Sequence, residues 1–176
     1  MDENQLAEVA WGIADSMRSF LWVVRPGLVP NSVGRLENLP NGFLEAVNGR
    51  GYIVNWAPQR EVLARPAIGA FWTHSGWNST LESICEGVPM ICSPLFGDQL
   101  INSRFVNDVW KFGLRLENGV EKGDVERVIR RIMADKEGEE IRERALSYKE
   151  KINYCVAEGG SSQQSLQSFV DYILSF

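Results

Sequence analysis

The chain has 176 residues, of which 44% are hydrophobic and 23% charged, and its formal net charge is −5. This length suits one α/β domain with its own core, and the acidic balance argues against nonspecific nucleic-acid binding, which needs basic patches. No apolar run approaches the roughly 20 residues of a membrane span, and the acidic N-terminus MDENQLAEVAWG is not typical of a secretory signal, so we expect a cytoplasmic protein.

Helical and strand-like segments alternate along the chain. Residues 3–18 carry apolar side chains at helical spacing, FLWVVR at 20–25 is an apolar β-rich run, and 26–40 is a loop rich in Pro and Gly. The elements predicted after this loop are a short helix over Asn41–Val47, a strand over Tyr52–Asn55, a helix over Gln59–Ala64, a strand over 68–73, a helix over Ser79–Glu86, a strand over 88–92, a helix over 98–111, a strand over 113–117, and helices over 123–134, 138–156 and 161–174. Because apolar strands alternate with helices, the pattern predicts an α/β fold with a doubly wound parallel sheet.

Two further features of the composition bear on fold and environment. The piece RRIMADKEGEEIRERALSYKEK is charge-dense and predicts a solvated helical face with i, i+4 pairs such as Glu140–Arg144. The cysteines Cys85, Cys92 and Cys155 have no C-x-x-C spacing, and we expect buried thiols in a reducing cytosol rather than disulfides or a zinc site.

The only histidine, His74, follows the predicted strand 68–73 and precedes a Gly-Trp-Asn-Ser turn that opens a helix. In a parallel sheet, ligands bind beyond the carboxyl ends of the strands. One interpretation of the turn is structural, with Ser79 and Glu82 forming a capping box. The other is an anion site, in which Gly76 allows close approach, Asn78 and Ser79 donate to phosphate oxygens, and the helix N-terminus attracts negative charge.

Two more clusters follow strands. Trp56 comes after the strand at 52–55 and is either a core residue or a stacking platform for a flat base. Asp98 is either a helix N-cap or, with Gln99, a clamp for neighbouring sugar hydroxyls. An aromatic platform, an anion-binding helix, a glutamate for a diol and an Asp-Gln clamp together predict a nucleotide-sugar site.

Residues 56–99, from WAPQREVL through THSGWNSTLESICEGVP to SPLFGDQ, resemble the donor-binding signature of plant secondary-product UDP-glycosyltransferases. The flanking FLWVVRP, LPNGFLE and GGSS stretches are also similar to this family, and the resemblance is strongest to the branch with cytokinin and diterpenoid glucosyltransferases. It implies that residues 1–176 are the Rossmann-like C-terminal domain of a GT-B glycosyltransferase, with helices on both faces of the sheet. We expect the first, central strand of that sheet and the N-terminal acceptor domain to be absent from this chain.

The family's donor contacts, carried over to matching positions, assign a part of UDP-glucose to each residue. The resemblance implies that Trp56 stacks on uracil with Ala57 and Gln59 at the uracil–ribose end, that Glu82 takes the ribose hydroxyls, that His74, Asn78, Ser79 and the Gly76 backbone hold the diphosphate, and that Trp77, Asp98 and Gln99 contact the sugar. Gln99 at the end of the signature goes with glucose donors in the family. Ser75 departs from the family's usual cysteine, and we expect a small local effect.

The activity implied by the resemblance is inverting transfer of glucose from UDP-glucose to a hydroxyl of a small molecule, with no metal or other cofactor. In the family the general base is a histidine of the N-terminal domain, and the single histidine here is assigned to phosphate, so we expect these residues alone to fold poorly and to transfer no sugar. A non-catalytic nucleotide-binding or regulatory fragment is the alternative. A nicotinamide oxidoreductase is disfavoured because no G-x-G-x-x-G follows a strand.

Overall fold

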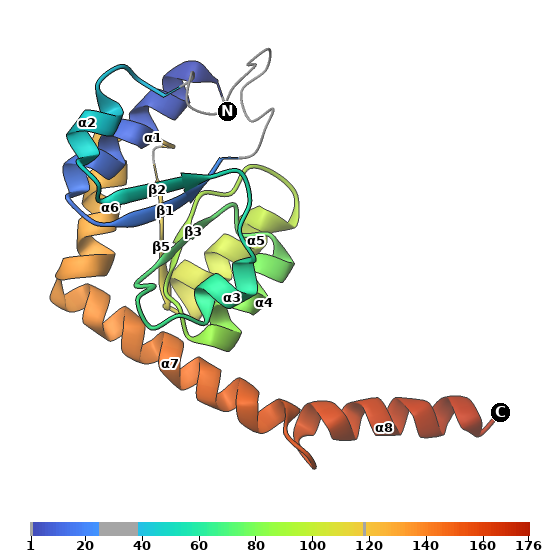
Figure 1. The fold of residues 1–176 in the computed structure, drawn as a ribbon. Helices are drawn as coiled ribbons and strands as arrows, with labels where there is room; N and C mark the ends of the chain where they lie inside the picture. Colours follow the sequence, from blue (N-terminus) through green and yellow to red (C-terminus); the bar gives the residue numbers. More distant parts are fainter. Residues whose placement is uncertain (1, 25–38, 118) are drawn as a thin grey trace.

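The computed structural model describes residues 2–24, 39–117 and 119–176 (Figure 1). Its elements are, in chain order, α1 (Glu3–Ser16), β1 (Phe20–Val23), α2 (Phe43–Val47), β2 (Gly51–Val54), α3 (Gln59–Leu63), β3 (Phe71–Thr73), α4 (Trp77–Glu86), β4 (Met90–Cys92), α5 (Asp98–Arg104), the π-helix η1 (Phe105–Val109), β5 (Gly113–Arg115), α6 (Lys122–Ala134), α7 (Lys136–Val156) and α8 (Ser161–Leu174). The predicted alternation of helices and strands is confirmed. Most of the predicted loop at 26–40, and Arg25 at the end of the first predicted strand, lie outside the described residues.

All strand pairs are parallel, as expected, but the strands form two sheets rather than one. β1 pairs with β2, while β3, β4 and β5 form a three-stranded sheet in the order β3–β4–β5. Within the described residues β1 and β3 do not pair with each other, so the ladder is interrupted between them.

Helices α1 and α6 pack side by side against one face of the strands (Figure 1). Val9 and Ile13 of α1 join Val125 and Ile132 of α6 in a core that also includes Ile91 and Leu114 from β4 and β5. The two helices approach closely at Gly12, where a Cβ atom would lie 2.5 Å from Cβ of Val125. Asp2 caps α1 with Gln5 in a capping box, and the helix ends at Ser16, two residues earlier than predicted.

The opposite face of the three-stranded sheet is covered by α4, η1 and α7. Ile84, Val106 and Ala145 from these helices pack against Met90 and Cys92 in a second buried cluster. All three residues of β4 are therefore buried, which is typical of a central strand in a parallel sheet. This arrangement gives the sheet helices on both faces, as predicted.

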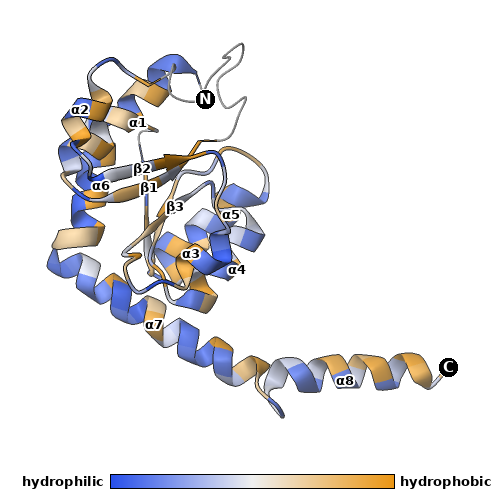
Figure 2. Cartoon of the chain, viewed as in Figure 1, coloured by the Kyte–Doolittle hydropathy of each residue, from blue (hydrophilic) through white to orange (hydrophobic). Residues whose placement is uncertain are grey.

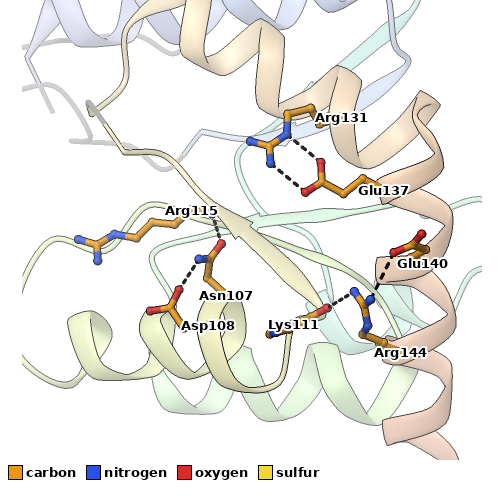
Figure 3. Close-up of polar contacts among 8 residues, drawn as sticks. All are labelled: Asn107, Asp108, Lys111, Arg115, Arg131, Glu137, Glu140 and Arg144. Atoms are coloured by element: carbon orange, nitrogen blue, oxygen red, sulfur yellow. Dashed lines mark hydrogen bonds and ion pairs between the residues drawn. The ribbon is translucent and has the colours of Figure 1, made fainter.

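The helix predicted at 98–111 is two elements, because the backbone changes to π-helical pairing from Phe105 to Val109. Figure 3 shows the polar contacts near this segment and α7. Glu137 accepts two hydrogen bonds from Arg131, which joins α6 to α7. The predicted pair of Glu140 and Arg144 is confirmed at 3.3 Å.

The last helix, α8, extends away from the rest of the chain and carries no buried residue (Figure 1). Hydrophobic residues nevertheless recur along it, including Leu166, Phe169 and Ile173 (Figure 2). No helix in the described ranges combines the length and apolar content needed to cross a membrane.

The three cysteines differ in their surroundings. Cys92 is buried in β4, and burial raises the pKa of its thiol to about 11, so that it stays protonated at neutral pH. Cys85 is exposed and Cys155 is half-buried, so the prediction of buried thiols is wrong for these two. Cys85 sits on the solvent side of α4, while its neighbours Ser83 and Ile84 are the buried residues of that turn.

Candidate functional site

The predicted site residues follow the carboxyl ends of three strands. Trp56 comes two residues after β2, His74 directly follows β3, and the loop leading to Asp98 follows β4. Parallel strands place such loops at one edge of the sheet, where ligands of open α/β folds bind.

At the end of β3, the His74 imidazole lies against the start of α4. Gly76 is the N-cap of this helix and makes no side-chain cap, and a Cβ atom at Gly76 would lie 2.5 Å from Nε2 of His74. The ring can occupy this position only because Gly76 has no side chain. The first backbone N–H groups of α4, at Trp77 and Asn78, have no partner within the helix, and His74 is exposed beside them. This arrangement suits an anion.

The turn between His74 and Gly76 depends on a residue in an uncommon conformation. Ser75 is fully buried and has φ of 64°, in the left-handed region, which costs of order 1–3 kcal/mol for a residue other than glycine. Two side chains hold it there. The Ser75 amide donates to Oγ1 of Thr73 at 3.2 Å, and Nδ2 of Asn102 donates to the Ser75 carbonyl at 3.0 Å.

The predicted capping box at Ser79 and Glu82 is wrong. The helix begins at Trp77, two residues earlier than predicted, so Ser79 lies inside its first turn and cannot be the N-cap. Both side chains instead accept hydrogen bonds from Nε2 of Gln59, at 3.2 Å to Oγ of Ser79 and 2.7 Å to Oε2 of Glu82. The structure thus brings together three predicted donor residues from α3 and α4.

Asp98 and Gln99 open α5, but Asp98 is not the N-cap that one interpretation predicted. Gly97 holds the N-cap position, with φ of 63°, and Oδ2 of Asp98 accepts from Nδ2 of Asn102 at 2.8 Å. Oε1 of Gln99 accepts from the amides of Leu95 and Phe96 at 2.9 and 3.2 Å. These bonds use the side-chain carbonyl of Gln99 to hold the loop before α5, and the residue is 7% exposed.

The aromatic residues of the signature are accessible. Trp56 is 73% exposed, so it is not the core residue that one interpretation predicted, and its face is open to a flat base. Trp77, the first residue of α4, is 49% exposed, and Ala57 is half-buried next to Trp56. Trp56 follows β2 of the two-stranded sheet, and α4 follows β3 of the three-stranded sheet.

Asn102 and Thr73 hold the turn after β3 through hydrogen bonds to Ser75. Neither residue is among the donor contacts predicted from the sequence. Asn102 lies four residues after Asp98, one helical turn away, and this spacing is the signal that points to their pairing.

Across residues 2–24, 39–117 and 119–176, no group of three or more His, Cys, Asp or Glu side chains is arranged to hold a metal ion. A polar cavity of about 300 Å³ lies between η1 and β5, lined by Arg104, Asn107, Asp108, Arg115 and Glu117, and it includes none of the predicted donor contacts.

The chain is similar to known proteins along its whole length. Residues 1–148 match the family model for "UDP-glucoronosyl and UDP-glucosyl transferase". UDP-glycosyltransferase 76B1 of Arabidopsis thaliana is 54% identical over all 176 residues, which cover 39% of that protein. UDP-glycosyltransferase 76G1 of Stevia rebaudiana is 56% identical over 99% of the chain and 37% of that protein. The chain thus spans about two fifths of the length of these relatives.

Solved structures agree with this relationship. UGT2 of Phytolacca americana, complexed with UDP-2-fluoro-glucose and pterostilbene, matches 98% of the chain and 39% of that structure with a TM-score of 0.89 and 35% identity. Os79 of O. sativa in complex with UDP matches with a TM-score of 0.86 over 98% of the chain and 38% of that structure, at 35% identity. The parallel sheets are those of the C-terminal part of GT-B enzymes. The chain therefore belongs to the UDP-glycosyltransferase family, in the branch that carries the number 76, and corresponds to the C-terminal portion of its members.

Proposed function

We propose that residues 1–176 form the donor-binding domain of a UDP-glucosyltransferase and bind UDP-glucose along the carboxyl edge of the strands. The observation that carries this proposal is that the His74 imidazole lies against the N-terminus of α4. It fits there because Gly76, the N-cap residue, has no side chain. A histidine and a helix terminus directed at one point bind an anion such as a diphosphate.

The remaining contacts follow from the geometry around this point. Gln59, Ser79 and Glu82 form one hydrogen-bonded group, in which Gln59 and Glu82 suit the ribose and Ser79 is assigned to the diphosphate. Asp98 and Gln99 follow β4, the strand that pairs with β3, and we assign the Asp98 carboxylate and the Gln99 carboxamide to the sugar hydroxyls. The expected order along the donor is uracil, ribose, diphosphate and glucose.

In the transfer reaction an acceptor oxygen attacks the anomeric carbon, the bond from that carbon to the diphosphate oxygen breaks, and the acceptor proton passes to a general base. The part of this domain is electrostatic: the start of α4 and His74 stabilise the negative charge that develops on the leaving UDP. With His74 used for phosphate, the chain has no second histidine to act as the base. We therefore expect no sugar transfer from these 176 residues alone, and donor binding only by the fraction of the chain that folds.

The test is a titration of the chain with UDP, UDP-glucose and UDP-galactose, followed by calorimetry or ligand-observed NMR, together with an assay of UDP release with phenolic and terpenoid acceptors. We expect binding of UDP and UDP-glucose, a preference for glucose over galactose, and no acceptor-dependent UDP release. Release of UDP on addition of an acceptor would show that a base is present in the chain. Failure to bind any uridine nucleotide while folded would overturn the proposed function.

A further inference from the structure

The proposed donor site is built on two separate segments. The turn at 74–79 follows β3 and carries the diphosphate contacts, while the segment at 93–99 follows β4 and carries the sugar contacts. The β3–β4 ladder, continued by the Ser93 amide that donates to the Thr73 carbonyl at 3.0 Å, fixes where the two segments start. Beyond that point, the side-chain link between them that the structure describes runs through another residue.

Asn102 makes this connection with a single nitrogen atom. Its Nδ2 donates to the carbonyl of Ser75 at 3.0 Å and to Oδ2 of Asp98 at 2.8 Å. The side chain belongs to α5 and the residue is 8% exposed; its hydrogen bond to Ser75 is buried, and its bond to the exposed Asp98 is partly buried. A buried polar group of this kind is costly unless its partners are in place, so the two bonds fix the amide and its acceptors together.

Each acceptor lies at a point that matters for the donor. The Ser75 carbonyl belongs to the peptide that joins Ser75 to Gly76. The orientation of this peptide sets the left-handed conformation of Ser75 and the position of Gly76 beside His74. The Asp98 carboxylate is the proposed contact for sugar hydroxyls. Carboxamide nitrogen carries two N–H donors, whereas a hydroxyl carries one and a carboxylate none, so aspartate or serine at this position cannot make both bonds.

We propose that Asn102 is a positioning residue that fixes the diphosphate turn and the sugar clamp relative to each other. This inference rests on the proposed function of the site. Asn102 does not contact the donor; it orients Ser75–Gly76 on one side and Asp98 on the other before the donor arrives. Such preorganisation raises the affinity for a ligand that contacts both segments. It does not change the affinity for a ligand that contacts neither of them.

We therefore predict that loss of the Asn102 side chain weakens the binding of UDP-glucose, UDP and uridine to different extents. Asn102→Ala should weaken UDP-glucose binding by about tenfold or more, because both the sugar clamp and the diphosphate turn lose their support. UDP, which reaches the turn but not the sugar clamp, should lose less. Uridine, which is bound at the Trp56 end, should keep its affinity within about twofold, which a general loss of structure would not allow.

A second variant tests the donor role of the amide. Asn102→Asp keeps the size of the side chain but places a carboxylate beside Asp98, where like charge raises its pKa. The protonated acid can donate one hydrogen bond, so the affinity of this variant for UDP-glucose should rise relative to wild type as the pH is lowered from about 8 to about 6. A residue that merely fills space would show no such pH dependence.

Asn107→Ala is the matched control. Asn107 is an asparagine of the adjoining η1 that donates to Asp108 and accepts from the Arg115 amide, away from the donor residues (Figure 3). This variant should bind UDP-glucose, UDP and uridine as wild type does. Binding of the three ligands would be measured by calorimetry or ligand-observed NMR on the full chain, with thermal unfolding recorded for each variant.

The outcomes separate the inference from the proposed function. Wild-type UDP-glucose affinity in Asn102→Ala would overturn the inference, as would an equal loss for uridine and UDP-glucose or the loss of a thermal transition in both Asn102 variants. A wild-type chain that binds no uridine nucleotide would overturn the proposed function itself. The expected result is intact uridine binding together with weakened UDP-glucose binding, restored in part for Asn102→Asp at low pH.

Discussion

The two sheets of this molecule differ in how completely they are packed. In the three-stranded sheet, β4 is buried on both faces between α1 and α6 on one side and α4, η1 and α7 on the other. In the two-stranded sheet, Leu21 and Val23 of β1 are 40% and 39% exposed, and Tyr52 of β2 is 74% exposed. One sheet is therefore a stable core, while the other is packed mainly on the side of α1 and α2.

This difference divides the proposed donor site. The diphosphate and sugar contacts follow β3 and β4 of the well-packed sheet, whereas Trp56, the proposed uracil platform, follows β2 of the partly exposed sheet. Groups that must be held to within a fraction of an ångström thus lie on the stable part, and the stacking surface, which tolerates small shifts, lies on the other.

The largest expected effect tests the packing difference itself. Met90→Ala removes a side chain with no exposed surface from the start of β4 and should lower the free energy of unfolding by about 2–5 kcal/mol. Leu21→Ala, at a position that is 40% exposed on β1, should cost less than about 1 kcal/mol. Urea unfolding of the two variants measures both values. Equal losses would mean that the two sheets contribute similarly to stability.

Next in size is the effect of Gly76→Ala on the phosphate end of the site. The backbone of Gly76, at φ −60° and ψ 149°, accepts alanine without strain, but the new Cβ would displace the His74 ring. Losing a charge-assisted contact should weaken UDP binding by about 1.5–3 kcal/mol while stability stays within about 1 kcal/mol of wild type. The measurement is UDP titration by calorimetry.

Gly123→Ala is the control for this substitution, because a Cβ at Gly123 meets no atom within 4 Å. It lies in α6, where alanine is favoured over glycine by about 1 kcal/mol, so stability should rise slightly and UDP affinity should not change. If Gly76→Ala bound UDP as well as Gly123→Ala does, the position assigned to His74 in donor binding would be wrong.

A somewhat smaller effect is expected at the uracil platform. Trp56→Ala should reduce UDP affinity by about 1–3 kcal/mol through lost stacking, and stability should be unchanged because the side chain is 73% exposed. Tyr52→Ala provides the comparison, since Tyr52 is an equally exposed aromatic of the preceding strand. A similar loss of affinity in both variants would indicate that the whole two-stranded sheet had shifted.

The smallest expected effect concerns the junction of α6 and α7, the helices that contribute Ile132, Ile141 and Ala145 to the two buried clusters on either face of the three-stranded sheet. The Arg131 guanidinium lowers the pKa of Glu137 through two hydrogen bonds. Because the pKa of Glu137 is lower in the folded state, the pair stabilises the protein above the ordinary pKa of a glutamate, and this stabilisation is lost as the pH falls through the folded value. The Glu137 side chain is 44% exposed and screened by water, so Glu137→Gln should cost at most about 1 kcal/mol near neutral pH.

This prediction is checked by urea unfolding as a function of pH. The difference between wild type and Glu137→Gln should shrink as the pH falls below the ordinary pKa of a glutamate and through the lowered folded pKa of Glu137. Glu139→Gln, at an exposed carboxylate of the same helix, should follow the wild type across the range. A difference that persists in acid would show that the effect comes from packing rather than charge.

Sequence alone determined the kinds and order of elements, the parallel pairing and the family. Helical periodicity and apolar strand runs are local properties, so α1, α6 and β4 lie within a few residues of their predicted bounds. The signature at 56–99 also predicted which side chains follow each strand, and the structure places Gln59 with Ser79 and Glu82, and His74 against Gly76.

Only the tertiary structure decided which partner each of these side chains has. Ser79 and Glu82 fit a capping box by spacing, yet Gln59, twenty residues away, donates to both, and α4 starts two residues earlier. The interruption of the sheet between β1 and β3, and the link from Asn102 to Ser75 across 27 positions, likewise depend on contacts between distant segments. Local spacing shows which hydrogen bonds a segment can make, but buried donors and acceptors pair with whichever groups the packing of distant elements brings within reach.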